Sequence, residues 1–401
     1  MARTERFAIA GAGIAGLTAA LALTQRGVPV RVYERRSADA VETGAGLQLS
    51  PNAMHALDAL DLADAIAERA SEPTEIAVRE GYFGAQVAQF PLGAAARRQF
   101  GAPYLQTARQ DLRAALLDAC RAQQIDITCG VAIDDFATSG DRLRLTLDSG
   151  TPASADALIV ADGVHSRLVG RLGGDMPRYA GFVAWRAVID IDRLPVALRR
   201  PITTLWLGDG AHVVTYPIAD GRKLNLLACV RREQWRSKRW SQPGERTELE
   251  RTFRRWHRDV RAAIAACDQL YVWALHHREP LERWYSERVV AMGDACHPML
   301  PFAAQGAAQA IEDALVLAQA LTDHDDPTQA FAAFQRGREN RVRAVFEESA
   351  ARAGIYHRGP VRRLLGFDIG RAARGQAAAL GQIGASFDWL YGYDVTTDGA
   401  A

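Results

Sequence analysis

Cysteine is scarce in this 401-residue sequence, and its placement excludes the common thiol-based and metal centres. A structural zinc site needs about four ligands in closely spaced pairs. No Cys-x-x-Cys or His-Glu-x-x-His motif occurs, and the five cysteines stand singly at Cys120, Cys129, Cys229, Cys267 and Cys296. The sequence therefore predicts no bound metal. Unpaired cysteines also favour a reducing compartment, which we take to be the cytoplasm.

An excess of charge of either sign is also missing. The chain has 48 Lys and Arg against 47 Asp and Glu, which gives a formal net charge of +1, with no basic run or acidic tail. Nucleic acids and anionic membranes are therefore not expected as partners. The length and the 48% hydrophobic content predict a globular chain of two or three domains. We expect a monomer or homodimer that binds small molecules.

One long uncharged run is present near the N-terminus. Residues 7–25, FAIAGAGIAGLTAALALTQ, follow two arginines and imitate a secretion signal or a membrane span. The three glycines argue against a span. We interpret the run as a short apolar strand, the turn Gly11-x-Gly13-x-x-Gly16, and a helix to about Arg26. A second strand, VPVRVYE, then ends at Glu34.

This order of elements is the context in which three glycines bind a dinucleotide. Gly11 makes the tight turn, Gly13 lets the backbone approach a pyrophosphate, and Gly16 lets helix and strand pack closely. The phosphates would lie at the helix N-terminus, while Glu34, with Arg35 beside it, would bind the ribose of an adenosine. The alternative is a glycine-rich turn in an ordinary βαβ unit. The motif alone does not separate FAD from NAD.

Two later strands end in aspartates. ALIVADGVHSR at residues 157–167 places Asp162 after a buried strand, and RVVAMGD at 288–294 places Asp294 after another. Both aspartates would lie at the carboxyl edge of one sheet, where open α/β folds bind ligands. The loop HPMLPFAAQG and a helix that starts near Gln305 follow the second. That helix N-terminus would hold the far half of an extended cofactor.

With GAGIAG, ADGVHS and GDACHPMLPFAAQG in this order, the chain resembles the class A flavoprotein aromatic hydroxylases with the para-hydroxybenzoate hydroxylase fold. Its motifs are most similar to those of salicylate hydroxylase and 3-hydroxybenzoate 6-hydroxylase. The resemblance extends from about residue 5 to WLYGYDV at 389–395. It implies an α/β fold, with a Rossmann-like FAD-binding domain, an inserted substrate domain with an antiparallel sheet, and a C-terminal helical segment.

The resemblance also assigns cofactor contacts. It implies that Asp294 bonds the ribityl chain of FAD and that the backbone of Gln305, Gly306 and Ala307 faces the flavin pyrimidine. Pro298, together with Pro301, would shape the loop beside the isoalloxazine, where Pro298 would also contact the substrate. In this reading Cys296 and His297 are structural.

Two further positions match the family in the middle of the chain. Arg109, in TARQDLR, would contact the cofactor phosphates or ribityl, and its alternative is a solvated arginine on a capped helix. Ile133 would pack on the adenine. One departure concerns the motif around Asp162, where Val169 stands in place of the usual arginine. Arg167 and Arg171 are nearby substitutes, and the choice between NADH and NADPH stays open.

Short alternating runs between about 179 and 230 predict an antiparallel sheet with one covered face. In HVVTYPI the two-residue period puts His212 and Tyr216 on one face. Similar enzymes place a His and a Tyr at this spacing beside the phenol of the substrate. We therefore take His212 as the candidate base and Tyr216 as a substrate ligand. The alternatives are a surface histidine and a core tyrosine.

These interpretations give expected boundaries. The FAD-binding domain would comprise 1–72, 103–178 and 275–327, the substrate domain 73–102 and 179–274, and the helical segment 328–401.

The expected activity is hydroxylation of a small aromatic acid, namely a hydroxybenzoate, a salicylate-like compound or a hydroxypyridine carboxylate. NAD(P)H would reduce FAD, and O2 would react through a flavin C4a-hydroperoxide. The alternatives are a flavin oxidase or dehydrogenase acting on another aromatic or polycyclic substrate, and a non-catalytic dinucleotide-binding sensor.

Overall fold

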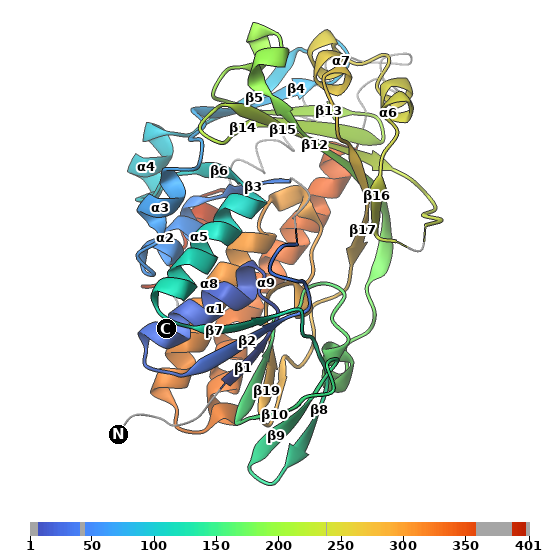
Figure 1. Ribbon diagram of the computed structural model, residues 1–401. Helices are drawn as coiled ribbons and strands as arrows, with labels where there is room; N and C mark the ends of the chain where they lie inside the picture. Colours follow the sequence, from blue (N-terminus) through green and yellow to red (C-terminus); the bar gives the residue numbers. More distant parts are fainter. Residues whose placement is uncertain (1–6, 41–44, 238, 358–386, 398–401) are drawn as a thin grey trace.

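The computed structural model describes residues 7–40, 45–237, 239–357 and 387–397 (Figure 1). Its elements form two main sheets with helices packed against each. Within the described ranges, every helix is too short or too polar to cross a membrane.

The first sheet is six-stranded, and the glycine motif lies at the carboxyl end of one of its interior strands. Its strands, in spatial order, are β18 (Tyr285–Ser286), β19 (Val289–Ala291), β11 (Ala157–Val160), β1 (Phe7–Ala10), β2 (Val30–Glu34) and β7 (Asp126–Cys129). All neighbours pair in parallel except β18 and β19. The runs FAIA and ALIV are buried along their whole length, as expected of parallel strands covered on both faces.

Helix α1 (Ile14–Gln25) packs against α5 (Arg109–Ala122) and α8 (Gly306–Asp323) beside this sheet. The long helix α9 (Pro327–Tyr356) packs on α8 and extends toward the second sheet (Figure 1). A small sheet of β8 (Ile133–Ser139), β9 (Arg142–Leu147) and β10 (Pro152–Ala155) contacts β11 through β9.

The second sheet is eight-stranded. Its order is β16 (Ser241–Pro243), β17 (Tyr271–His277), β12 (Arg178–Asp190), β15 (Lys223–Arg231), β14 (Ala211–Ile218), β13 (Thr203–Gly208), β4 (Glu75–Glu80) and β5 (Gln86–Pro91). Two segments that are far apart in sequence, 75–91 and 178–277, therefore build one sheet.

The remaining elements connect or cover these sheets. Strands β3 (Gly46–Leu49) and β6 (Leu105–Ala108) pair between them. The short helices are α2 (Pro51–Asp58), α3 (Ala63–Ala67), α4 (Ala94–Phe100), α6 (Arg246–Thr252) and α7 (Arg258–Ala265). The 3-10 turns are η1 (Leu168–Leu172), η2 (Ile191–Arg193), η3 (Val196–Leu198), η4 (Gly293–Ala295) and η5 (Pro301–Ala303).

The expected α/β fold is confirmed, but two details of the second sheet differ from the prediction. The sheet is mixed, because β13 pairs with β4 in parallel. It is also covered on both faces, and every residue of β13 is buried. Helices α6 and α7 pack on one face, where Trp206 joins Leu249 and Ile264. The other face turns toward the first sheet, where Leu205 and Leu207 join Phe302.

Candidate active site

The glycine motif has the close contacts that its spacing predicts. A Cβ on Gly16 would lie 1.9 Å from the carbonyl oxygen of Gly11, so helix and strand approach too closely for any other residue. Gly11 itself has φ +103°, and a Cβ there would lie 2.6 Å from the carbonyl oxygen of Ala161. Gly13 is different, because no atom lies within 4 Å of its would-be Cβ. The open space lies at Gly13, where a pyrophosphate would approach.

The N-terminus of α1 begins at this opening. Gly13 is its N-cap, and no side chain caps its N–H groups, so this helix end suits an anion. Glu34 is buried at the end of β2 and accepts hydrogen bonds from the N–H of Ala12 (2.7 Å) and of Arg36 (2.9 Å). The carboxylate is thus held against the glycine loop.

Arg113 is a residue that the sequence reasoning missed. Its Nε donates to the carbonyl oxygen of Ala12 in the glycine loop (3.0 Å). Arg113 lies one helical turn after Arg109 on α5, and this i, i+4 spacing was an available signal. Arg109 itself is exposed at the first position of α5.

The ADGVHS loop gathers polar atoms that have no protein partner. Among the described residues, the buried atoms without a hydrogen bond include Asp162 Oδ1, His165 Nε2 and Ser166 Oγ. Burial raises the pKa of Asp162, and the nearby Ser166 hydroxyl, more than the positive charge of Arg35, partly offsets that rise. Buried polar groups are normally satisfied, so this cluster fits a polar ligand that runs between the loop and Arg35.

Asp294 and the start of α8 form the other end of the candidate cofactor site. Asp294 is exposed while its neighbours Gly293 and Ala295 are buried. Its Oδ1 lies 3.6 Å from the would-be Cβ of Gly306, the first residue of α8. No side chain caps this helix, and Gly306 and Ala307 are partly exposed. The geometry suits the polar edge of a flat ring at the helix N-terminus.

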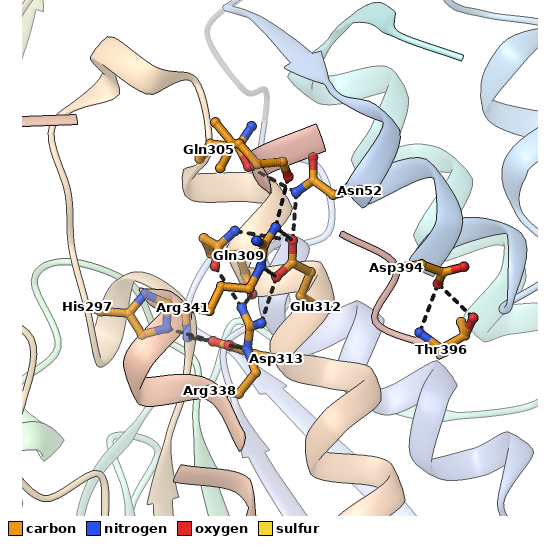
Figure 2. Close-up of polar contacts among 12 residues, drawn as sticks. Asn52, His297, Gln305, Gln309, Glu312, Asp313, Arg338, Arg341, Asp394 and Thr396 are labelled. Carbon is orange, nitrogen blue, oxygen red and sulfur yellow. Dashed lines mark hydrogen bonds and ion pairs between the residues drawn. The ribbon is translucent and has the colours of Figure 1, made fainter. Parts of the chain in front are cut away.

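The side chain of Gln305 points elsewhere, into a buried polar network (Figure 2). It donates to Ser50 Oγ (2.8 Å) and accepts from Asn52 Nδ2 (3.0 Å), and Asn52 also donates to Glu312 (2.6 Å). Only the backbone of Gln305 is left for a flavin.

The acids of this network are paired with arginines of α9. Arg338 contacts both Glu312 (2.7 Å) and Asp313 (2.8 Å), and all three side chains are fully buried. Arg341 forms a second pair with Glu312 (2.7 Å). Burial would raise the pKa of Asp313, but the charges of His297 and Arg338 outweigh it and hold that pKa at about 2. The network fastens α9 to α8 directly behind the helix N-terminus.

His297 and Cys296 belong to this supporting layer. His297 Nε2 lies 2.7 Å from Asp313 Oδ2, and its ring packs against Trp284. Cys296 is fully buried, and burial raises the pKa of its thiol. Neither side chain is placed to act as a nucleophile or as part of a metal site.

His212 and Tyr216 lie on one buried face of β14, the face that turns toward the first sheet. His212 packs against Phe302 of η5 and Tyr356 of α9. Tyr216 packs beside Ala108, and its ring carbon Cε2 is 2.8 Å from the would-be Cβ of Gly46. The surface-histidine alternative is excluded, since His212 is 1% exposed. Burial raises the pKa of Tyr216, so its phenol stays protonated.

A second histidine fixes the proton of His212. His357 Nδ1 lies 2.8 Å from the carbonyl oxygen of Ala353, an atom that can only accept, so His357 carries its proton there. Burial lowers the pKa of His357 to about 4, which keeps it neutral and leaves its Nε2 as an acceptor. That Nε2 lies 3.0 Å from His212 Nδ1. His212 must therefore donate through Nδ1–H, and its Nε2 holds a lone pair.

The same two histidines lie near Cys229. Their ligand atoms and the Cys229 sulfur are all within 4.8 Å of one another, a spacing that a metal ion can use. Burial raises the pKa of this thiol and lowers that of His212, so the cluster is neutral while no metal is bound. The absence of a metal stays a prediction.

The remaining residues named from the sequence are Ile133, Pro298, Arg171 and Arg167. Ile133 is buried at the start of β8, two residues after Val131, whose N–H bonds the carbonyl oxygen of Glu34. Pro298 is buried in the loop between η4 and η5. Arg171 pairs with Asp135 and bonds the carbonyl oxygen of Phe136, so β8 engages its guanidinium. Arg167 is exposed.

Known proteins are similar to this chain both in sequence and in architecture. The family model described as FAD binding domain matches residues 4–349. The chain is 35% identical over 398 residues to 3-amino-4-hydroxybenzoate 2-monooxygenase PtnB3 of Streptomyces platensis, which covers 98% of each chain. It is 34% identical over 398 residues to 3-hydroxybenzoate 6-hydroxylase of Polaromonas naphthalenivorans, covering 96% of each. The crystal structure of Klebsiella pneumoniae HpxO complexed with FAD and uric acid superposes with a TM-score of 0.82 at 26% identity, covering 98% of this chain and 97% of that one.

Proposed function

The chain belongs to the FAD binding domain family and is an FAD-dependent aromatic monooxygenase, and on that premise we propose that it hydroxylates a small aromatic acid bearing a ring hydroxyl, with NAD(P)H and O2 as co-substrates. The observation that carries this substrate class is the buried face of β14, on which His212, with a lone pair left on Nε2, and Tyr216 both lie. Two similar proteins, named above, act on hydroxybenzoates, which supports the proposal.

The residues at the edge of the first sheet fit FAD. Gly13 and the uncapped α1 would receive the pyrophosphate, with Glu34 at the adenosine ribose. Asp294 would bond the ribityl chain, and the backbone of Gly306 and Ala307 would face the pyrimidine ring. Bound FAD supplies the redox chemistry, taking electrons from NAD(P)H and passing them to O2.

His212 would accept the phenolic proton of the substrate. A free phenol has a pKa near 10 and holds its proton at neutral pH, whereas attack on the ring needs the electron density of the phenolate. Burial lowers the pKa of His212, so the imidazole is neutral and its Nε2 is available. The proton would move to Nε2 as the ring is attacked, which is general-base catalysis.

Tyr216 would orient the ring by a hydrogen bond from its protonated phenol. Phe302, Leu205 and Leu207 line the same side of the sheet, and such apolar neighbours keep water from the reacting centre.

We also propose domain boundaries that follow the two sheets. The FAD-binding domain would be residues 1–72, 103–178 and 275–327, and the substrate domain 73–102 and 179–274. Of the segment 328–401, residues 358–386 and 398–401 lie outside the described residues. Helix α9 would brace both domains, since it packs on α8 and contacts His212 through Tyr356.

The test is the product formed per NAD(P)H oxidised, with a panel of hydroxybenzoates and hydroxypyridine carboxylates. His212→Asn should slow hydroxylation by about 100-fold to 10,000-fold, the usual range for a lost general base. FAD content and the rate of flavin reduction should stay near wild type, so electrons would leave as H2O2. Tyr216→Phe should mainly weaken substrate binding, by about 1 to 3 kcal/mol.

Other outcomes would overturn the proposal. If His212→Asn keeps wild-type coupling and pH profile, the histidine is not the base. If no panel compound yields an oxygenated product while another aromatic substrate is oxidised without oxygen insertion, the protein works as an oxidase or dehydrogenase. If no compound stimulates NAD(P)H oxidation at all, a sensor is favoured.

A further inference from the structure

Arg186 is a cation on the substrate side of the second sheet. Along β12, Trp185 and Ala187 pack with α6 and α7 on the outer face. The residues on either side of Arg186 on the inner face are Ala184, which joins the cluster of Phe302, and Val188, which packs in the cluster of Tyr216. By the two-residue period of a strand, Arg186 projects between these clusters.

The register places Arg186 in the same row as the candidate catalytic pair. Arg186 is opposite Leu227 on β15, and Leu227 is opposite Val214 on β14. Val214 stands between His212 and Tyr216 on their shared face. Two strand spacings of about 4.8 Å, with Leu227 between them, put Arg186 roughly 10 Å from Val214 along the sheet. A small aromatic ring lying over this row could reach both ends.

No carboxylate pairs with Arg186 among the described residues. Its Nε is buried and has no hydrogen-bond partner, and its guanidinium lies 4.7 Å from the ring centroid of Trp273. Burial lowers the pKa of Arg186, although not enough to remove its charge. A buried cation without an acid is costly, so the arrangement favours an anionic ligand.

Arg186 is electrostatically coupled to two side chains of the inner face, Tyr216 and Cys229. Its charge partly offsets the rise that burial causes in the pKa of Tyr216 and of Cys229, which shows that both side chains lie within electrostatic reach. Arg109 acts on Arg186 in turn as a second nearby positive charge. Positive charge therefore faces the space beside Tyr216.

We infer that Arg186 binds the carboxylate of the aromatic substrate, while His212 and Tyr216 hold its ring hydroxyl. A guanidinium can bond a carboxylate through two parallel N–H groups, which fixes the ring plane as well as its position. The carboxylate at one end and the hydroxyl at the other then determine which ring carbon meets the cofactor. This inference rests on the proposed function.

The experiment compares an acid with a neutral analogue in the FAD-loaded protein. Binding of 3-hydroxybenzoate, 4-hydroxybenzoate and salicylate, and of the three matching hydroxybenzamides, is followed through the flavin absorbance spectrum. Arg186→Met should weaken the best acid by about 10-fold to 100-fold and leave its amide within about 2-fold. Arg186→Lys keeps the charge without the two parallel donors and should fall between wild type and Arg186→Met.

Arg79→Met is the matched control. Arg79 also lies over a tryptophan ring, Trp206, at 5.7 Å, but on the outer face of the sheet. This variant should bind acids like wild type. The apo-protein of Arg186→Met should be at least as stable as wild type in urea, because no buried partner loses its counter-charge.

Four results would overturn the inference. Equal losses for acid and amide would make Arg186 a packing residue, and a loss of FAD content would assign it to the cofactor. A large loss of apo-protein stability would mean that Arg186 has an acidic partner within the chain. If the wild-type protein binds none of the acids, the proposed function fails and this inference fails with it.

Discussion

At the scale of single residues, the contact between His212 and His357 determines what the candidate base can do. The carbonyl oxygen of Ala353 accepts a hydrogen bond from His357 Nδ1–H, and His357 Nε2 accepts one from His212 Nδ1–H. His357 therefore acts as a positioning residue, since it selects the His212 tautomer whose Nε2 can take a proton. In serine proteases, loss of the group that fixes the histidine tautomer costs far more than a single hydrogen bond.

We predict that His357→Leu lowers the hydroxylation rate and the product formed per NAD(P)H by about 10-fold to 100-fold, because His212 then loses its preferred tautomer. The pH profile should shift as well. His357→Gln is the control, because its Oε1 can accept from His212 Nδ1–H and should restore most of the coupling. Equal defects in both variants would indicate a packing role only.

The same pair predicts a pH dependence of stability. Burial lowers the pKa of His357 from its ordinary 6.5 to about 4. Between pH 4 and pH 6.5 this histidine is protonated in the unfolded chain but neutral in the folded protein. The contribution of neutral His357 to the free energy of unfolding is therefore complete above pH 6.5 and is lost as the pH falls toward 4. The loss should be about 1 to 3 kcal/mol in urea titrations at stepped pH. His357→Gln should reduce this slope without removing it, because the pKa of His212 is lowered by burial as well. An unchanged slope would contradict the assignment.

At the scale of elements, the junction of α8 and α9 contains a buried ionic network beside its apolar contacts (Figure 2). The network lies directly behind Gly306, the first residue of α8. The network holds the N-terminus of α8 against Asn52 and Ser50, so the helix end stays aligned with the flavin site that we propose.

We predict that Arg338→Met destabilises the apo-protein by about 3 to 5 kcal/mol, because Glu312 and Asp313 are both buried and both lose one of their cationic partners. Urea unfolding followed by circular dichroism measures this. Arg336→Met, an exposed change on the same helix, should stay within about 0.5 kcal/mol of wild type. A comparably small effect of Arg338→Met would show that the carboxylates take up protons instead.

At the scale of the whole molecule, bound FAD would contact three loops and helix ends that are far apart in the sequence. The glycine loop, the ADGVHS loop and the start of α8 come from three distant parts of the chain and end at one edge of the first sheet. A ligand that binds only this folded arrangement must stabilise it by mass action.

We predict that the purified protein is yellow with one noncovalent FAD, and that its melting temperature rises with added FAD. Glu34→Ala and Asp294→Ala should each weaken FAD binding by about 1 to 3 kcal/mol, measured by quenching of flavin fluorescence. Asp118→Ala, at an exposed ion pair on α5, should leave the affinity unchanged. A colourless protein that ignores added FAD would refute the assignment of the site.

Some of the candidate site was within reach of the sequence, and some was not. The sequence did not predict that both faces of β13 are covered. A two-residue alternation shows only which side chains share a face, and both faces of this strand are buried. Arg186 did leave a signal, as the one charge inside the otherwise apolar run FVAWRAVI. Its meaning depends on which face is inside, and no periodicity gives that.

What the sequence determines by itself here is the nucleotide-binding unit. The strand, glycine turn, helix and second strand are contiguous, and the steric need for glycine at positions 11 and 16 is a property of a few neighbouring bonds. Only the tertiary structure decides the proton state of His212, because His357 lies 145 residues away. It likewise decides the network of Asn52 and Glu312, which are 260 residues apart. A hydrogen bond acts over about 3 Å whatever the separation along the chain, so such partners are chosen by strand register and helix packing.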